Sequence, residues 1–180
     1  MSRGRLRFMI LAAIIAALTA VVAQVKLLLP ITVVPVTLQV LMVYLAGALL
    51  GPVWGAISML LYLLLGAIGL PVFAGGAGGL NVLVGLTGGY LVSYPVAAYL
   101  IGLLAPPGRT QPFWRIAAAM LAGLVVVYIG GGLWAMVLGK GLAVVVTAFV
   151  LPFLPLDLAK LLVAAVLAAA VRRALASQGY

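Results

Sequence analysis

Residues 153–162 read Phe-Leu-Pro-Leu-Asp-Leu-Ala-Lys-Leu-Leu, and they contain Asp157, the only acidic residue of this 180-residue chain. Lys160 follows three positions later, so on a helix the two charged side chains would share one face. An ionisable residue near the centre of a bilayer costs roughly 2.5–3.5 kcal/mol even on lenient insertion scales. This charged pair inside an apolar run therefore predicts a membrane protein with a functional site at Asp157 and Lys160.

The composition supports this interpretation, because 68% of the residues are hydrophobic and only 6% are charged. A soluble domain usually has a charged share of about 25%. The chain has no cysteine and no histidine, which excludes thiol chemistry and the usual zinc or haem ligation. A single carboxylate offers little for acid–base catalysis, and the sequence has no Walker A motif. We therefore expect no enzyme activity, no ATP hydrolysis and no cofactor in this chain.

Prolines and glycines divide the apolar sequence into six predicted transmembrane helices, each near the roughly 17–25 residues that a bilayer requires. The predicted spans are residues 8–29, 36–50, 53–70, 88–105, 113–138 and 155–171. Residues 142–151 are too short to cross and are predicted to form an interfacial or re-entrant segment. The expected fold is a single all-α integral membrane domain over residues 1–180.

The arginines predict the orientation of these six helices. An even number of spans puts both termini on one side, and all seven arginines then fall on that side: Arg3, Arg5, Arg7, Arg109, Arg115, Arg172 and Arg173. Positive charge marks the cytoplasmic side, so we expect cytoplasmic N and C termini in the cell membrane. Charges at helix ends also account for the net charge of +9, and we expect no nucleic-acid binding.

Residues 71–87 form the predicted outer loop between the third and fourth helices, and seven glycines lie between Gly75 and Gly89. Irregular backbone at membrane depth is tolerated only when it is buried or lines a cavity. We expect this loop to fold over a pocket, although a plain flexible connection remains an alternative. Asn81, Tyr90, Asp157 and Lys160 would then meet at the outer end. A structural alternative for Asp157 is a favourable interaction with the helix dipole, with Lys160 neutralising it.

Small residues form a ladder on the first predicted helix. Ala12, Ala16 and Ala20 are spaced four residues apart, with Ala13 and Ala17 beside them. Such faces let helices approach closely in lipid. The ladder could be an internal contact or a docking face for another subunit.

Five segments, in this order along the chain, resemble the BioY family, the biotin-specific substrate-binding (S) components of energy-coupling factor (ECF) transporters. They are Pro-Val-Thr-Leu-Gln at 35–39, Leu-Ala-Gly-Ala-Leu-Leu-Gly-Pro at 45–52, Gly-Leu-Pro-Val-Phe-Ala-Gly-Gly-Ala-Gly-Gly at 69–79, Thr-Gly-Gly-Tyr at 87–90, and Pro-Phe-Leu-Pro-Leu-Asp-Leu-Ala-Lys at 152–160. The Phe-Ala-Gly-Gly-Ala-Gly-Gly and Pro-x-Asp-x-x-Lys segments are the specific ones.

The resemblance implies a six-helix S component that binds biotin at the outer membrane face and delivers it inward. It implies a transmembrane coupling protein (EcfT or BioN type) as partner, and cytoplasmic ATPases (EcfA or BioM type) that use ATP. Its implied biotin contacts are Asn81, Tyr90, Asp157 and Lys160, with Thr37, Gln39, Gly75 and Gly76 nearby. Its implied docking residues are Ala12, Ala13, Ala16, Ala17 and Ala20. The alternatives are an S component for another small vitamin and a non-transporting membrane assembly protein.

Overall fold

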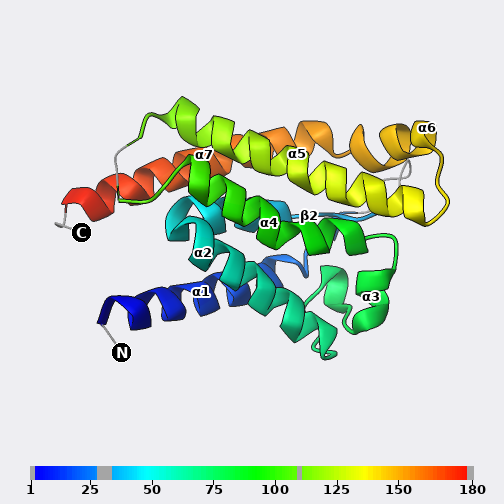
Figure 1. The fold of residues 1–180 in the computed structure, drawn as a ribbon, viewed down its shortest axis with the longest axis horizontal. Helices are drawn as coiled ribbons and strands as arrows, with labels where there is room; N and C mark the ends of the chain where they lie inside the picture. The colour runs from blue at the N-terminus through cyan, green and yellow to red at the C-terminus, as the bar shows by residue number, and fades with distance from the viewer. Residues whose placement is uncertain (1–2, 28–33, 109–110, 178–180) are drawn as a thin grey trace.

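Helices make up nearly all of the regular structure in the computed structural model, which describes residues 3–27, 34–108 and 111–177. In chain order the elements are α1 (Arg3–Val22), β1 (Lys26–Leu27), β2 (Val36–Thr37), α2 (Gln39–Ala67), the 3₁₀ turn η1 (Ala74–Gly76), α3 (Leu80–Val84), α4 (Gly88–Leu104), α5 (Phe113–Val137), α6 (Leu142–Val144), the π-helical turn η2 (Val145–Val150) and α7 (Leu154–Ser177). The start of α1 and the end of α7 lie at the same end of the molecule (Figure 1). The prediction of a mostly helical protein is confirmed.

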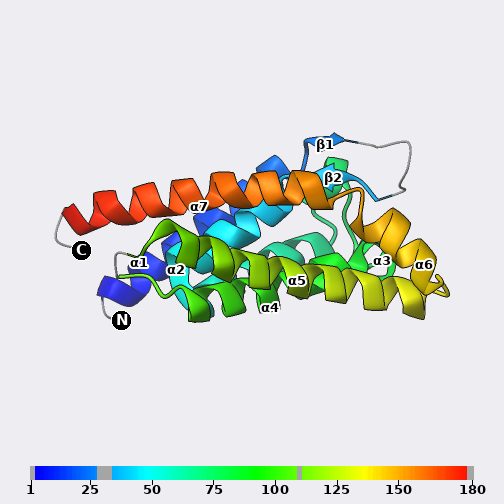
Figure 2. The same cartoon turned by 90° about the horizontal axis from the view of Figure 1, so that it is seen from above.

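Four helices of the described residues are long and apolar enough to cross a membrane, namely α1, α2, α5 and α7. Helix α4 is equally apolar but has only 17 residues. All five run broadly lengthwise through the molecule, as the view from above also shows (Figure 2). The outward faces of these helices carry many exposed large apolar side chains, such as Leu64 and Val137, as expected where helices contact lipid.

Helix α2 is interrupted at Gly51, whose φ of 79° and ψ of −175° are not helical. This backbone conformation suits glycine, and Pro52 then starts the second half with the φ that a first helical turn needs. The two halves pack closely, because a Cβ atom on Gly55 would lie 2.9 Å from the carbonyl oxygen of Ala46. The halves correspond to the predicted spans 36–50 and 53–70.

The structure differs from the first two predicted helices, because two short strands lie between α1 and α2. Strands β1 and β2 pair antiparallel, with Lys26 opposite Thr37 and Leu27 opposite Val36. Helix α1 therefore ends at Val22 instead of continuing towards residue 29, and residues 36–37 are strand where a helix start was predicted. Residues 28 and 29 lie outside the described part of the chain.

The remaining helices lie close to their predicted ranges. Helices α4 and α5 each end one residue before the predicted boundary, whereas α7 begins one residue earlier and continues to Ser177. Residues 142–150 form the short elements α6 and η2 rather than a long helix. These two elements have 3 and 6 residues, and the interfacial or re-entrant position of the segment stays a prediction.

Glycines allow α4 to pack tightly at the centre of the molecule. A Cβ atom on Gly102 would overlap the backbone at Gly51, and one on Gly89 would overlap Trp134 of α5. Close backbone approach of this kind is how helices associate in lipid, where the hydrophobic effect gives little driving force. Helix α4 is therefore held between α2 and α5, which fixes the position of the tyrosines at its start.

Candidate ligand-binding site

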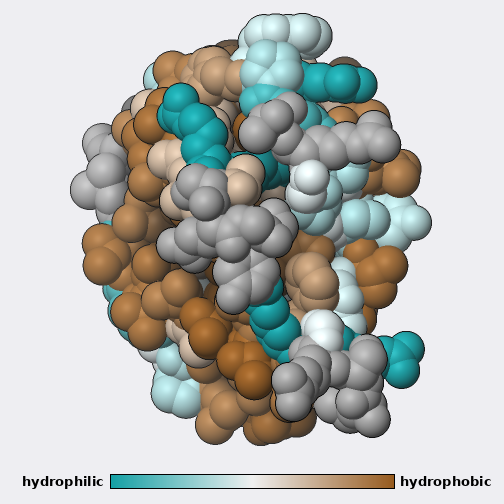
Figure 3. Space-filling model, turned by 90° about the vertical axis from the view of Figure 1, so that its left-hand side faces the viewer, coloured by the Kyte–Doolittle hydropathy of each residue, from teal (hydrophilic) through white to brown (hydrophobic). Residues whose placement is uncertain are grey.

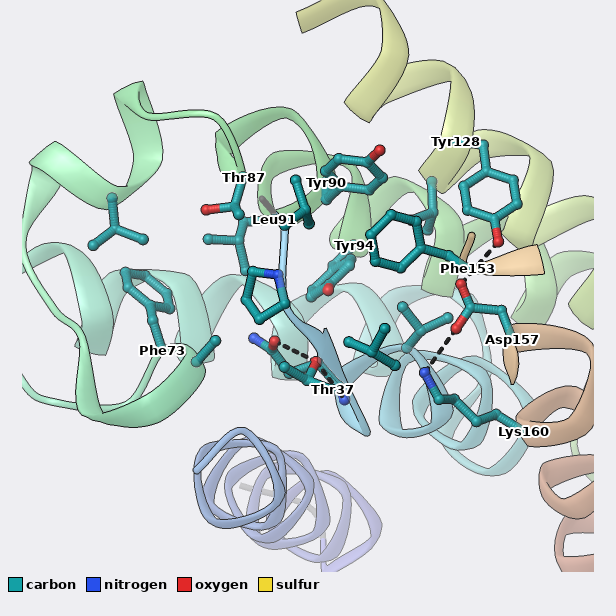
Figure 4. Close-up of a pocket in the computed structure, with 18 of the residues that line it drawn as sticks. Thr37, Phe73, Thr87, Tyr90, Leu91, Tyr94, Tyr128, Phe153, Asp157 and Lys160 are labelled. Carbon is teal, nitrogen blue, oxygen red and sulfur yellow. Dashed lines mark hydrogen bonds and ion pairs between the residues drawn. The ribbon is translucent and has the colours of Figure 1, made fainter. Parts of the chain in front are cut away.

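A cavity lies between β2, α2, α4, α5, α7 and the loop that follows α2 (Figure 4). These elements meet in the half of the molecule remote from the termini (Figure 2). It contains about 780 Å³ of empty space, part of it open to solvent. Five of the predicted site residues line it, and they are Thr37, Gln39, Tyr90, Asp157 and Lys160.

Asp157 lies in the first turn of α7, as predicted, and it is only 4% exposed. Its Oδ1 atom accepts a hydrogen bond from Lys160 Nζ at 2.8 Å, forming an ion pair between residues three positions apart. Its Oδ2 atom accepts from the hydroxyl of Tyr128 on α5 at 2.9 Å. Figure 4 shows both contacts converging on the carboxylate. The site thus presents an anion and a cation side by side on an otherwise apolar wall.

A second set of polar side chains in the cavity lining is hydrogen bonded internally. Thr37 Oγ1 donates to Gln39 Oε1 at 2.6 Å, and Gln39 Nε2 donates to the hydroxyl of Tyr62 at 2.6 Å. The Tyr62 hydroxyl in turn donates to the carbonyl of Val72 at 3.0 Å. This series of hydrogen bonds connects the start of α2 to the loop that follows α2. Thr37 and Gln39 therefore help to hold that loop in place at the cavity.

Tyr90 contributes its ring to the cavity, while its hydroxyl is used elsewhere. The hydroxyl donates to the carbonyl of Phe149 in η2. A Cβ atom on Gly131 of α5 would overlap the Tyr90 ring, so this glycine makes room for it. Tyr90 therefore acts mainly as an apolar ring face, which the sequence alone did not distinguish from a hydrogen-bonding role.

The glycine-rich loop is folded against the helices. Phe73 is 1% exposed and packs edge-to-face on Tyr62, with ring centroids 5.5 Å apart. Phe73, Ala74 and Ala77 line the cavity. The loop therefore forms one wall of the cavity, as expected of a loop folded over a pocket.

Three predicted site residues of this loop do not line the cavity. Gly75 and Gly76 have φ of 67° and 80°, and the Gly75 amide donates to the carbonyl of Ala23 beyond the end of α1 at 3.0 Å. Asn81 is exposed on α3, and its side chain lies against Gly79. The structure brings the loop to the cavity but not these three residues.

Several lining residues were not predicted from the sequence. Tyr128, Tyr94 and Phe153 surround the carboxylate end of the cavity (Figure 4). The tyrosines carried a usable signal, because a hydroxyl in the middle of an apolar helix normally needs a partner. Phe153 carried no such signal, since an apolar residue in an apolar segment gives no indication of a site.

The structure separates the alanines of α1 into two faces. Ala12 and Ala16 are buried at 2% and 0% exposure, and Ala20 is partly buried. Ala13 and Ala17 are exposed. The ladder therefore serves an internal contact, and only Ala13 and Ala17 remain on the outer surface.

The fold and the cavity together define a helical membrane protein with a partly polar cavity of ligand-binding type. The chain belongs to the BioY family, whose family model matches residues 1–177. The "Probable biotin transporter BioY" of Pyrococcus horikoshii is 42% identical over 159 residues, which are 88% of this chain and 91% of the relative. The "Biotin transporter BioY" of Thermotoga maritima is 39% identical over 168 residues, or 93% and 97% of the two chains.

A solved structure gives the same result. The crystal structure of the S-component for biotin from an ECF-type ABC transporter superposes with a TM-score of 0.87 and 27% sequence identity. The match covers 96% of this chain and 95% of that one. With these relatives and its apolar helices, the chain is a multi-pass integral protein of the cell membrane.

Proposed function

We propose that this chain binds biotin in the cavity and delivers it inward as the S component of an ATP-driven ECF transporter. Membership of the BioY family and the likeness to a solved S-component for biotin support the proposal. The observation that carries it is the Asp157–Lys160 pair, whose oxygen and nitrogen lie 2.8 Å apart on the wall of the cavity.

The chemistry of biotin suits this pair. The ureido ring of biotin has two N–H donors and one carbonyl acceptor, so a carboxylate can accept from it while an ammonium donates to it. Charge-assisted hydrogen bonds of this kind are about twice as strong as neutral ones. Phe73, Phe153 and the ring of Tyr90 supply apolar surface for the bicycle and the valerate tail.

Binding would add to the contacts of Asp157, because each of its oxygens now accepts one hydrogen bond and a carboxylate has about four acceptor sites. The ureido N–H groups would share the Asp157 carboxylate with Tyr128 and Lys160, or take the place of one of these donors. Asn81, Gly75 and Gly76 would contact the ligand after a movement of the glycine-rich loop, of which Ala74 and Ala77 already line the cavity.

The proposed topology has six crossings, with both termini cytoplasmic and the glycine-rich loop outside. In this arrangement the two halves of α2 count as separate crossings, because the helix is broken at Gly51. The shared position of the start of α1 and the end of α7 supports an even number (Figure 1). Labelling of single cysteines introduced at exposed positions in each loop would test it.

The proposed partners are biotin, a transmembrane coupling protein and two cytoplasmic ATPases, which would use the ATP. Ala13 and Ala17 are proposed as docking residues, because they form an exposed small-residue face on α1. The buried Ala12 and Ala16, with Ala20 beside them, would support that face from behind.

The decisive experiment is calorimetric titration of the purified single chain in detergent with biotin, with desthiobiotin and riboflavin as comparisons. One-to-one binding of biotin without any partner, and none of riboflavin, supports the proposal. Tight binding of riboflavin alone would favour an S component for another vitamin. Folded protein that binds none of the three would favour a membrane assembly protein, with a purely structural Asp157–Lys160 pair.

A further inference from the structure

A second hollow lies at the opposite end of the molecule, where α5 begins and α7 ends. It has about 910 Å³ of empty space, part of it open to solvent. Figure 3 faces this end of the molecule, where hydrophilic groups gather among a largely hydrophobic surface. The hollow shares no residue with the proposed biotin cavity, so its role is independent of the proposed function.

Arg172 forms the floor of this hollow and is only 7% exposed. Its Nε and Nη2 atoms donate to the carbonyl of Ala48, and Nη2 also donates to the carbonyl of Ala105. Its Nη1 atom is buried and has no hydrogen-bond partner in the described part of the chain. Leaving a buried neutral donor without a hydrogen bond costs roughly 1–3 kcal/mol of stability, and the cost is higher for a donor on a charged group.

This chain supplies no acidic side chain to pair with Arg172. Its single carboxylate side chain, Asp157, lines the other cavity and is paired with Lys160. Arg173, the next residue, also lines the hollow and is exposed. Both arginines thus line a space that holds no acidic side chain of the protein.

Gln111 adds an acceptor to the same hollow. Its Nε2 atom donates to the carbonyl of Pro106 at 3.3 Å, whereas its buried Oε1 atom has no partner among residues 3–27, 34–108 and 111–177. The rest of the lining is mainly apolar, and Phe113 and Val166 are both exposed at its edge. A suitable ligand therefore combines an anion, a hydroxyl donor and an apolar chain.

We propose that this hollow binds the phosphoglycerol headgroup of an anionic phospholipid. The phosphate would lie between Arg172 and Arg173, because a guanidinium group can donate two parallel hydrogen bonds to phosphate oxygens. A hydroxyl of the headgroup glycerol would donate to Gln111 Oε1, and the acyl chains would follow Phe113 and Val166. Basic pockets between transmembrane helices at the headgroup level are typical sites for anionic lipids, and the neighbouring Trp114, 68% exposed, fits an interfacial aromatic belt.

Native mass spectrometry of the purified chain in detergent tests the proposal, with titrations of phosphatidylglycerol, phosphatidic acid, phosphatidylcholine and free glycerol 3-phosphate. We expect phosphatidylglycerol to bind most tightly, because it alone of the four combines a net negative phosphodiester, a headgroup hydroxyl and acyl chains. Equal binding of phosphatidylcholine would overturn the proposal, and tight binding of glycerol 3-phosphate would replace the lipid with a soluble phosphate.

Variants assign the binding to this hollow. Arg173→Ala should weaken phosphatidylglycerol binding at least about tenfold, because it removes a direct charge-assisted hydrogen bond to the phosphate and not only a nearby charge. The matched control is Arg115→Ala, an exposed arginine near the same end that does not line the hollow, and it should change binding less than about twofold. Equal effects of the two variants would refute a specific site.

Gln111→Leu tests the headgroup hydroxyl. This variant should lower the affinity for phosphatidylglycerol and leave that for phosphatidic acid unchanged, because phosphatidic acid lacks the headgroup glycerol. Equal losses for the two lipids would contradict the hydroxyl contact. Arg172 is left unchanged in these tests, since its hydrogen bonds to Ala48 and Ala105 hold three helical segments together.

Discussion

Replacing Asp157 with asparagine should weaken biotin binding and destabilise the protein for two separable reasons. The change keeps the shape of the side chain but leaves the Lys160 ammonium, whose side chain is 11% exposed, without its counter-ion at 2.8 Å. Breaking a buried ion pair by removing one partner costs roughly 3–5 kcal/mol. Because Lys160 keeps some exposure, we expect about 3 kcal/mol, or a fall in Tm of roughly 6–12 °C.

The loss of affinity has a different origin. A hydrogen bond to a charged group contributes about 1.5–3 kcal/mol, so Asp157→Asn should weaken biotin roughly 10- to 150-fold. The double variant Asp157→Asn/Lys160→Met removes the unpaired ammonium together with the carboxylate. It should recover most of the lost stability, to within about 1 kcal/mol of the original chain, but none of the lost affinity.

Thermal unfolding and calorimetric titration of the three proteins measure these two effects separately. Ser93→Ala is a suitable control, because Ser93 is buried and polar but does not line the cavity, and it should leave biotin binding unchanged. A folded double variant that binds biotin within about threefold of the original chain, less than about 0.7 kcal/mol, would refute the role of Asp157 as a ligand contact. The pair would then be structural.

Three further substitutions test other parts of the structure. Gly66→Ala would put a methyl group into the ring of Phe73, and we expect a loss of about 1–3 kcal/mol in unfolding free energy with weaker biotin binding; an unchanged Tm would contradict the packing. Tyr128→Phe removes the donor to Asp157 Oδ2, so stability should fall by about 1.5–3 kcal/mol, as for other hydrogen bonds to a charged group, while biotin affinity is kept. A tenfold loss of affinity in calorimetry would instead make the hydroxyl a ligand contact. Ala17→Trp should preserve biotin binding and prevent co-purification with the coupling protein, and normal assembly would remove Ala17 from the proposed interface.

The sequence predicted the charged part of the cavity because the information there is local. In so apolar a chain a lone carboxylate must have a partner, and helical periodicity places Lys160 beside Asp157. Tyr128 and Tyr62 depend instead on how distant helices pack, and no spacing along the chain reveals which hydroxyl meets which acceptor. Asn81 shows the same limit, since its loop was placed correctly near the cavity while its side chain lies outside.

The helix boundaries show which local signals are reliable. The prolines and glycines around α4 and α5 predicted those helices to within one residue. The pairing of Lys26 with Thr37 could not be predicted, because two-residue strands are too short to show any periodicity. Helix α7 continues past Val171 to Ser177, and there Arg172 donates to carbonyls in α2 and after α4, contacts that no pattern within α7 specifies.

The break at Gly51 has a consequence for membrane insertion. A straight helix over the 29 residues of α2 would be about 44 Å long, well beyond the roughly 30 Å hydrocarbon core. The nascent chain can therefore enter the membrane there either as one strongly tilted segment or as a helical hairpin, and the Gly51-Pro52 step favours the hairpin. In the proposed topology this choice determines the sidedness of everything synthesised afterwards. A substitution that keeps position 51 helical would turn the two crossings of α2 into one. Helices α4, α5 and α7 would then cross the membrane in the opposite direction, with Arg172 and Arg173 on the outer surface.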